Sequence, residues 1–171
     1  MATQPLRGVR PLRRRSGGPI APMYFPEAAS QSFKAGEMVY LVSGKVTEFT
    51  ATADTGTARF LGFAAQDATG TTDTRIGVWV PDDDLIFIAS MYHGTAANAV
   101  TAITDPLTLW PFYQDTTKSA VYPDKANTSG QIDCCRVVGL WADELGSIET
   151  VGDIYGQVLF IVEAAGRLIA Q

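Results

Sequence analysis

The stretch FKAGEMVYLVSGKVTEF, residues 33–49, holds two short runs of β-branched and aromatic residues on either side of Ser43-Gly44. The runs 38–42 and 45–49 have the length and the β-branched and aromatic residues that are typical of β-strands. A Ser-Gly pair between two such runs is a signal for a hairpin turn. The stretch therefore predicts a β-hairpin, and no residue in it suggests catalytic chemistry.

Runs with the length and composition of strands continue along the rest of the chain. Seven further strands are expected, at residues 59–65, 75–80, 85–90, 107–113, 119–122, 135–141 and 156–164. Segments rich in turn-forming residues separate them, and only residues 93–100 and 141–145 suggest a turn or two of helix. This pattern predicts an all-β fold, a small antiparallel β-sandwich or barrel. More than about a third of the residues should be in strands and well under about a sixth in helices.

Residues 1–32 differ from the rest in composition. They cannot form a helix or a central strand, because they contain five prolines, Pro5, Pro11, Pro19, Pro22 and Pro26. We therefore expect an extended N-terminal arm over residues 1–32 and a single β-domain over residues 33–171. On this division, deletion of residues 2–26 should leave the β-domain folded.

The charge follows the same division. The chain of 171 residues has a formal charge of −5, but all 18 acidic residues lie at or after Glu27 and five of the 13 basic ones lie in the first 15 positions. From residue 16 onward the balance is 8 minus 18, or −10. The basic arm can bind phosphates or an acidic protein surface, including the body of a neighbouring copy, and we favour a protein partner.

Five arm residues are the candidate partner-binding residues. Arg13, Arg14 and Arg15 would supply charge-assisted hydrogen bonds, and Tyr24 and Phe25 would be apolar anchors. Aromatic residues between prolines have little reason to lie in a solvated tail, so they either dock on a partner or cover the core of their own domain.

No residue pattern points to catalysis, a cofactor or a metal. The single histidine, His93, has no catalytic serine or cysteine context around it. Cys134 and Cys135 are adjacent, so they form no disulfide framework and no metal motif, and we interpret them as buried thiols. We interpret residues 82–84, three consecutive aspartates, as a solvated turn that blunts a sheet edge, because their spacing matches no calcium loop.

The chain also lacks the apolar run of a membrane span and the apolar core of a signal peptide, so we expect a soluble, unsecreted protein. Residues 85–89 and 158–162 are apolar on both faces. Such strands lie either in the middle of a two-layer sandwich or against another subunit.

Taken together, the hairpin and the strands that follow it resemble the head decoration (cement) proteins of tailed bacteriophages and related prophage proteins. The resemblance covers residues 33–90 and does not include the arm. It is carried by Phe33, Gly36, Val39, Leu41, Gly44 and Val46 of the hairpin, by Leu61, Gly62 and Ala64, and by Val78, Val80 and Pro81.

This resemblance implies a structural protein without enzymatic activity. It would be made in the host cytoplasm and bind the outside of the virion head, often as a homotrimer. There it would stabilise contacts between neighbouring major capsid proteins. From the sequence itself we expect no membrane partner and favour protein over nucleic acid as the partner.

Two other classes of protein fit the same sequence features. A small viral coat protein could use the basic arm to bind nucleic acid, and its affinity would then fall steeply with salt. A carbohydrate-binding or adhesin module could use Trp79, Trp110 or Trp141 as stacking platforms, although core packing is the simpler role for tryptophans in apolar strands.

Overall fold

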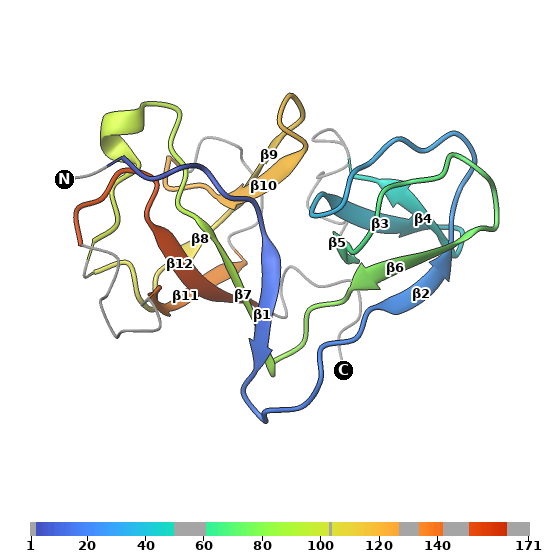
Figure 1. Cartoon of the computed structure of the whole chain (residues 1–171), viewed down its shortest axis with the longest axis horizontal. Helices are drawn as coiled ribbons and strands as arrows, with labels where there is room; N and C mark the ends of the chain where they lie inside the picture. Colours follow the sequence, from blue (N-terminus) through green and yellow to red (C-terminus); the bar gives the residue numbers. More distant parts are fainter. Residues whose placement is uncertain (1–2, 50–60, 103, 127–133, 142–150, 164–171) are drawn as a thin grey trace.

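The structure is a computed structural model that describes residues 3–49, 61–102, 104–126, 134–141 and 151–163. Of these residues 45% are in strands and 2% are helical, which confirms the expected all-β class. The sheets are antiparallel and form two lobes in a sandwich-like arrangement (Figure 1). Within the described ranges no sheet closes into a barrel. No helix in them is long and apolar enough to cross a membrane.

The first sheet has the strand order β1-β7-β12-β11-β8. Its strands are β1 (Arg10–Arg14), β7 (Leu85–Ser90), β12 (Gln157–Val162), β11 (Cys135–Leu140) and β8 (Leu109–Trp110). All six residues of β7 are buried, and β7 pairs with β12 at one edge and with β1 at the other. The strand predicted to be apolar on both faces is thus covered within a single chain.

The second sheet has the order β2-β6-β5-β3-β4. Its strands are β2 (Met23–Pro26), β6 (Arg75–Trp79), β5 (Gly62–Ala64), β3 (Met38–Val42) and β4 (Lys45–Glu48). The predicted hairpin is confirmed as β3 and β4. Ser43 and Gly44 both have positive φ, at 50° and 79°, and this is the backbone geometry that matches a two-residue turn to the twist of paired strands.

A small hairpin of β9 (Phe112–Asp115) and β10 (Ala120–Pro123) lies between the two lobes (Figure 1). The single strand predicted over residues 107–113 is therefore divided into β8 and β9. Pro111 lies at the break, because proline has no N–H to donate to a strand ladder. The helical turn expected in residues 93–100 is the 3-10 helix η2 (Ala96–Asn98), and most of residues 141–145 lies outside the described ranges.

The main hydrophobic core joins the two lobes. Phe63 of β5 packs edge-on against Phe87 of β7 and Phe112 of β9, with ring centroids 5.1 and 5.4 Å apart. Phe160 of β12 stacks on Phe87 at 5.7 Å. A second cluster, which includes Phe33 and six aliphatic residues, lies within the lobe of the second sheet. Because aromatic residues from both sheets share one core, the lobes form one packed unit.

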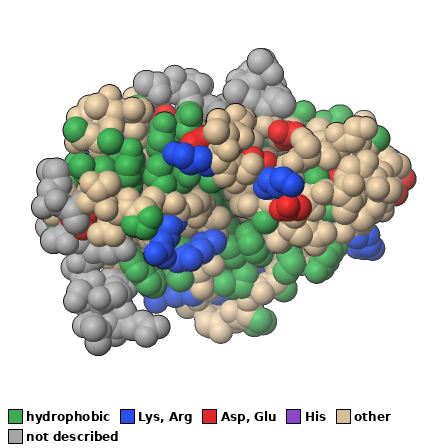
Figure 2. All heavy atoms as spheres, turned by 45° about the horizontal axis from the view of Figure 1, so that its top comes forward, with side chains coloured by type: hydrophobic (Ala, Val, Ile, Leu, Met, Phe, Trp, Pro, Cys, Tyr) green, Lys and Arg blue, Asp and Glu red, His purple; other side chains and the backbone are tan. Residues whose placement is uncertain are grey.

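Outside this core, the surface is mixed. Figure 2 shows apolar side chains gathered over the lobe of the first sheet and acidic and basic side chains interspersed along the middle of the molecule.

The N-terminal segment does not stand apart as an arm. Residues 10–14 form β1, the edge strand of the first sheet, and residues 23–26 form β2, the edge strand of the second. Glu27 is fully buried, and its carboxylate accepts hydrogen bonds from Thr69 and Gly70. The expected arm is thus not confirmed over residues 3–32, although both strands do lie at edges, where proline is tolerated.

This arrangement reverses the expectation for deletion of residues 2–26. The deletion removes the strands that cover β7 and β6, and it exposes the core around Val9, whose side chain is 4% exposed. We expect a decrease in Tm of about 6–12 °C, equivalent to about 3 kcal/mol for a chain of this size. Thermal unfolding followed by circular dichroism measures the change, with Arg10→Ala/Arg15→Ala as the control that keeps both strands. An unchanged Tm for the truncated chain would show that the segment is dispensable.

Candidate interaction surface

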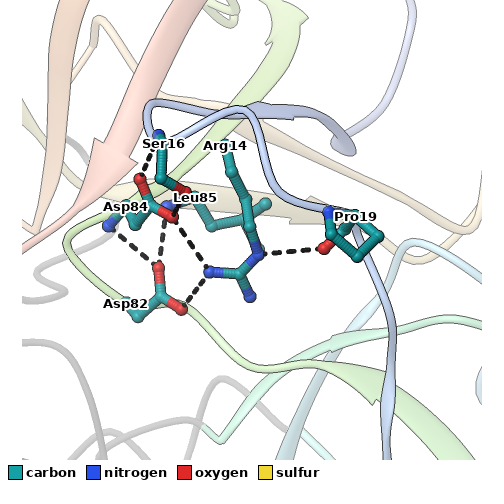
Figure 3. Close-up of polar contacts among 6 residues, drawn as sticks. All are labelled: Arg14, Ser16, Pro19, Asp82, Asp84 and Leu85. Atoms are coloured by element: carbon teal, nitrogen blue, oxygen red, sulfur yellow. Dashed lines mark hydrogen bonds and ion pairs between the residues drawn. The ribbon is translucent and has the colours of Figure 1, made fainter.

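Within the described residues, the passages 15–22 and 80–84 each connect a strand of one lobe to a strand of the other. Hydrogen bonds hold the two passages side by side (Figure 3). Arg14, at the end of β1, lies between them and donates from Nη1 to Oδ2 of Asp82 at 2.8 Å and to Oδ2 of Asp84 at 3.4 Å. Its Nε donates to the carbonyl oxygen of Pro19 at 3.2 Å.

Ser16 completes the contact. Its backbone N–H donates to Oδ1 of Asp84 at 2.8 Å, and its hydroxyl donates to Oδ2 at 2.6 Å. These two bonds, more than the nearby Arg14 guanidinium, hold the pKa of Asp84 below its ordinary value. We call the four residues Arg14, Ser16, Asp82 and Asp84 the Arg14 clasp.

The clasp gives the aspartate run a structural role. Asp82 also accepts hydrogen bonds from the backbone N–H groups of Asp84 and Leu85, at 2.9 and 2.7 Å, and so orders the start of β7. Asp83, between the two, is exposed. The described residues contain no group of three His, Cys, Asp or Glu side chains that could hold a metal ion.

The five residues predicted to bind a partner therefore have different environments. Arg14 is occupied by the clasp, and Phe25 is partly buried against the core of the second lobe. Arg13 and Arg15 are exposed on β1 and just after it, and Tyr24 on β2 is 52% exposed. Of the two roles that the sequence left open, Phe25 covers the core of its own chain, whereas Tyr24 faces solvent.

Two exposed residues were not among those predicted. Arg10 is exposed at the start of β1, and Met23, beside Tyr24, is 51% exposed. The signal for Met23 was present in the sequence, because it stands with Tyr24 and Phe25 between two prolines. We call Arg10, Arg13, Arg15, Met23 and Tyr24 the N-terminal strip.

Both edges that carry the strip are closed to strand addition. The N–H of Glu27, just after β2, donates to the carbonyl oxygen of Thr74. Backbone groups of successive residues in an antiparallel strand point alternately to its two sides, so the N–H and C=O groups that point away from β6 belong to residues 22, 24 and 26. Pro22 and Pro26 have no N–H, and Arg75 donates to the carbonyl oxygen of Tyr24 at 3.4 Å. β1 contains Pro11 and a bulge between Pro11 and Arg13. A partner of the strip must therefore bind through side chains rather than by extending a sheet.

The residues considered for catalysis, metal binding or carbohydrate stacking have contacts within the fold. Nδ1 of His93 accepts a hydrogen bond from the N–H of Thr95, two residues along the same loop. Trp79 and Trp110 pack against the main core. Both cysteines are buried, and burial raises the pKa of the Cys135 thiol. These contacts account for the histidine, two tryptophans and the cysteines as parts of the fold.

Loss of the clasp should destabilise the protein. We expect Arg14→Ala to lower Tm by on the order of 2–4 °C, because it leaves two neighbouring carboxylates without their shared cation. Arg15→Ala removes the same charge from an exposed neighbour and should change Tm by less than about 1 °C. Differential scanning calorimetry at low and high salt measures both effects, and the Arg14 effect should shrink with salt. Equal effects of the two substitutions would contradict the clasp.

The clasp should also make stability depend on pH in the acid range. The ordinary pKa of the Asp84 carboxyl is 3.8, and the folded pKa lies below it. The stabilisation is therefore complete above the ordinary value and is lost as pH falls through the folded pKa. Asp84→Asn should lower Tm near neutrality, and its difference from wild type should decrease below that value. Ser16→Ala should weaken the same acid dependence, and a Tm difference that stays constant with pH would contradict this account.

Comparisons of the chain with protein-family models, curated proteins and solved structures found no match. The function is therefore inferred from the residues and contacts of this chain and from the resemblance of residues 33–90.

Proposed function

We propose that the protein is a capsid decoration protein that binds the outside of a phage head, works as a homotrimer and stabilises contacts between major capsid proteins. The observation that carries the proposal is the N-terminal strip. It presents three arginines on or just after β1 and two half-exposed apolar side chains on β2, and both edge strands are closed to backbone pairing. The resemblance of the hairpin and the strands that follow it supports the same class of protein.

The strip fits a protein surface. Met23 and Tyr24 can bury apolar area, and this contributes about 25 cal/mol per Å². Arg10, Arg13 and Arg15 can form bidentate hydrogen bonds to carboxylates on the partner. The arginines lie at the edge of the first sheet, and Met23 and Tyr24, as neighbours in β2, point to opposite faces of the second sheet, so a matching partner would present acidic side chains to β1 and apolar side chains to β2. On this proposal that partner is the outer surface of the major capsid protein.

The rest of the fold supports a mechanical role. A decoration protein must hold its shape while it bridges neighbouring subunits, and it needs no reaction centre. Here the N-terminal segment is paired into both sheets, and aromatic residues of both lobes share one core. A load applied at the strip is thus transmitted to β7 and β6, which lie next to the strip-bearing strands.

Co-sedimentation with phage heads tests this function. The heads are those of the phage or prophage that carries the gene, purified without the protein. We expect the wild-type protein to sediment with them and Arg13→Glu/Arg15→Glu to bind at least about tenfold more weakly, because buried charge pairs at an interface become repulsive. Tyr24→Ala should also weaken binding and leave Tm unchanged.

The matched control is Lys34→Glu/Lys118→Glu, which changes the net charge equally at exposed sites outside the strip. This variant should bind like wild type. Absence of wild-type protein from the head fractions, or strong DNA binding at moderate salt together with no head binding, would overturn the proposal and favour the nucleic-acid-binding coat protein.

A further inference from the structure

Strand β7 depends on β1 for the cover of one edge. β7 is buried along its whole length, and its sequence Leu-Ile-Phe-Ile-Ala-Ser carries no charge and no proline. β12 covers one edge and β1 covers the other. Without β1, an apolar strand with unpaired backbone groups would be exposed, and such edges pair readily with another strand. β7 therefore binds a strand at this edge strongly, whichever chain supplies it.

β1 itself is attached mainly by backbone pairing. Its burial pattern contains no buried residue, and only Val9, just before it, is buried in the core. The Arg14 clasp that fixes its end is partly exposed. β1 also lies at an edge of its sheet. Its release breaks the pairing with β7, the bridge between Thr3 and Ile154 and the hydrogen bond from the N–H of Val9 to Val121, and leaves the pairs between the other strands in place.

The segment after β1 has the composition of a hinge. Residues 15–22 contain Gly17, Gly18, Pro19 and Pro22. Gly17 has a φ of +78° and no neighbour within 4 Å of the position that a Cβ would occupy, and its N–H donates to the carbonyl oxygen of Arg14 at 3.1 Å to close the turn. If this turn opens, residues 17–22 can span about 20 Å as an extended chain. That reach is enough to carry β1 to an adjacent molecule.

From these three features we propose that β1 is exchanged between copies of the protein when they are held side by side. Residues 3–16 of one copy then pair with the first lobe of a neighbour and form the same bonds, including the clasp to Asp82 and Asp84. A dilute molecule keeps β1 on its own β7, because the short hinge gives it a high effective concentration there. This proposal goes beyond capsid binding and does not depend on it.

Mixed disulfides between chains test the exchange. Arg13 pairs with Ile86 across β1 and β7, and the Ile86 side chain is 6% exposed. In a background with Cys134→Ala and Cys135→Ala, a tagged Arg13→Cys chain and an untagged Ile86→Cys chain are mixed and oxidised. We expect the mixed disulfide at high protein concentration, at least about tenfold above its amount after dilution.

The control pairs tagged Arg13→Cys with Ser32→Cys, an exposed residue that can meet it only by collision. The chain carrying both Arg13→Cys and Ile86→Cys should form an internal disulfide when dilute and linked oligomers when concentrated. A mixed disulfide no more abundant than the control, with only internal disulfides in the double variant at every concentration, would overturn the proposal.

A variant without new cysteines gives an independent test. Deletion of Gly17 and Gly18 shortens the hinge so that the turn cannot close within one chain. We expect this variant to elute as a dimer or larger species with the strand content of wild type, since β1 then reaches β7 only on another copy. A folded variant that elutes as a monomer at all concentrations would contradict strand exchange.

Discussion

The pairing of β1 with β7 is the constraint on which the rest of the structure depends. β7 is buried along its whole length and lies between the N-terminal strand and the C-terminal strand β12. Its apolar side chains form part of the core that joins the two lobes, where Phe87 contacts Phe63 of the second sheet. A backbone edge left open here would expose polar groups beside the largest apolar cluster of the protein. The arginine-rich beginning of the chain therefore serves the fold first.

Ion pairs and hydrogen bonds of the Arg14 clasp fix one end of the pairing between β1 and β7. The Arg14 clasp joins the two passages between the lobes, so the aspartates that end one passage hold the beginning of the other. The remaining exposed arginines of β1 also keep the open edge of the sheet from pairing with other strands, as do Pro11 and the bulge after it. The same residues that protect the edge form the proposed binding strip. A single short segment thus combines an edge strand, a joint between lobes and the surface that we propose for a partner.

The sequence predicted strands where an apolar run stands next to turn-forming residues. It did not predict pairing between segments that are far apart in the chain. Ser43-Gly44 predicted the hairpin of β3 and β4, and the apolar run at residues 85–90 predicted β7 with its observed bounds. β1 and β2 were missed because edge strands are only half buried, so Arg10–Arg14 shows no apolar period. The clasp was missed because Asp82 lies 68 residues from Arg14. Tyr24 and Phe25 were both predicted to be apolar anchors, but only the structure shows that Phe25 packs against the second lobe while Tyr24 is exposed.

The most direct test of this account is native-state hydrogen exchange at the N-terminal segment. The N–H of Val9 donates to Val121, and that of Glu27 donates to Thr74, whereas the N–H of Met91 donates to Gly156 in the first lobe. If the segment is part of both lobes, Val9 and Glu27 should be protected to within about a factor of ten of Met91 in dilute protein. Exchange of Val9 and Glu27 at the rate of an unstructured peptide, with Met91 still protected, would show that residues 3–32 are a separate arm and would contradict the account.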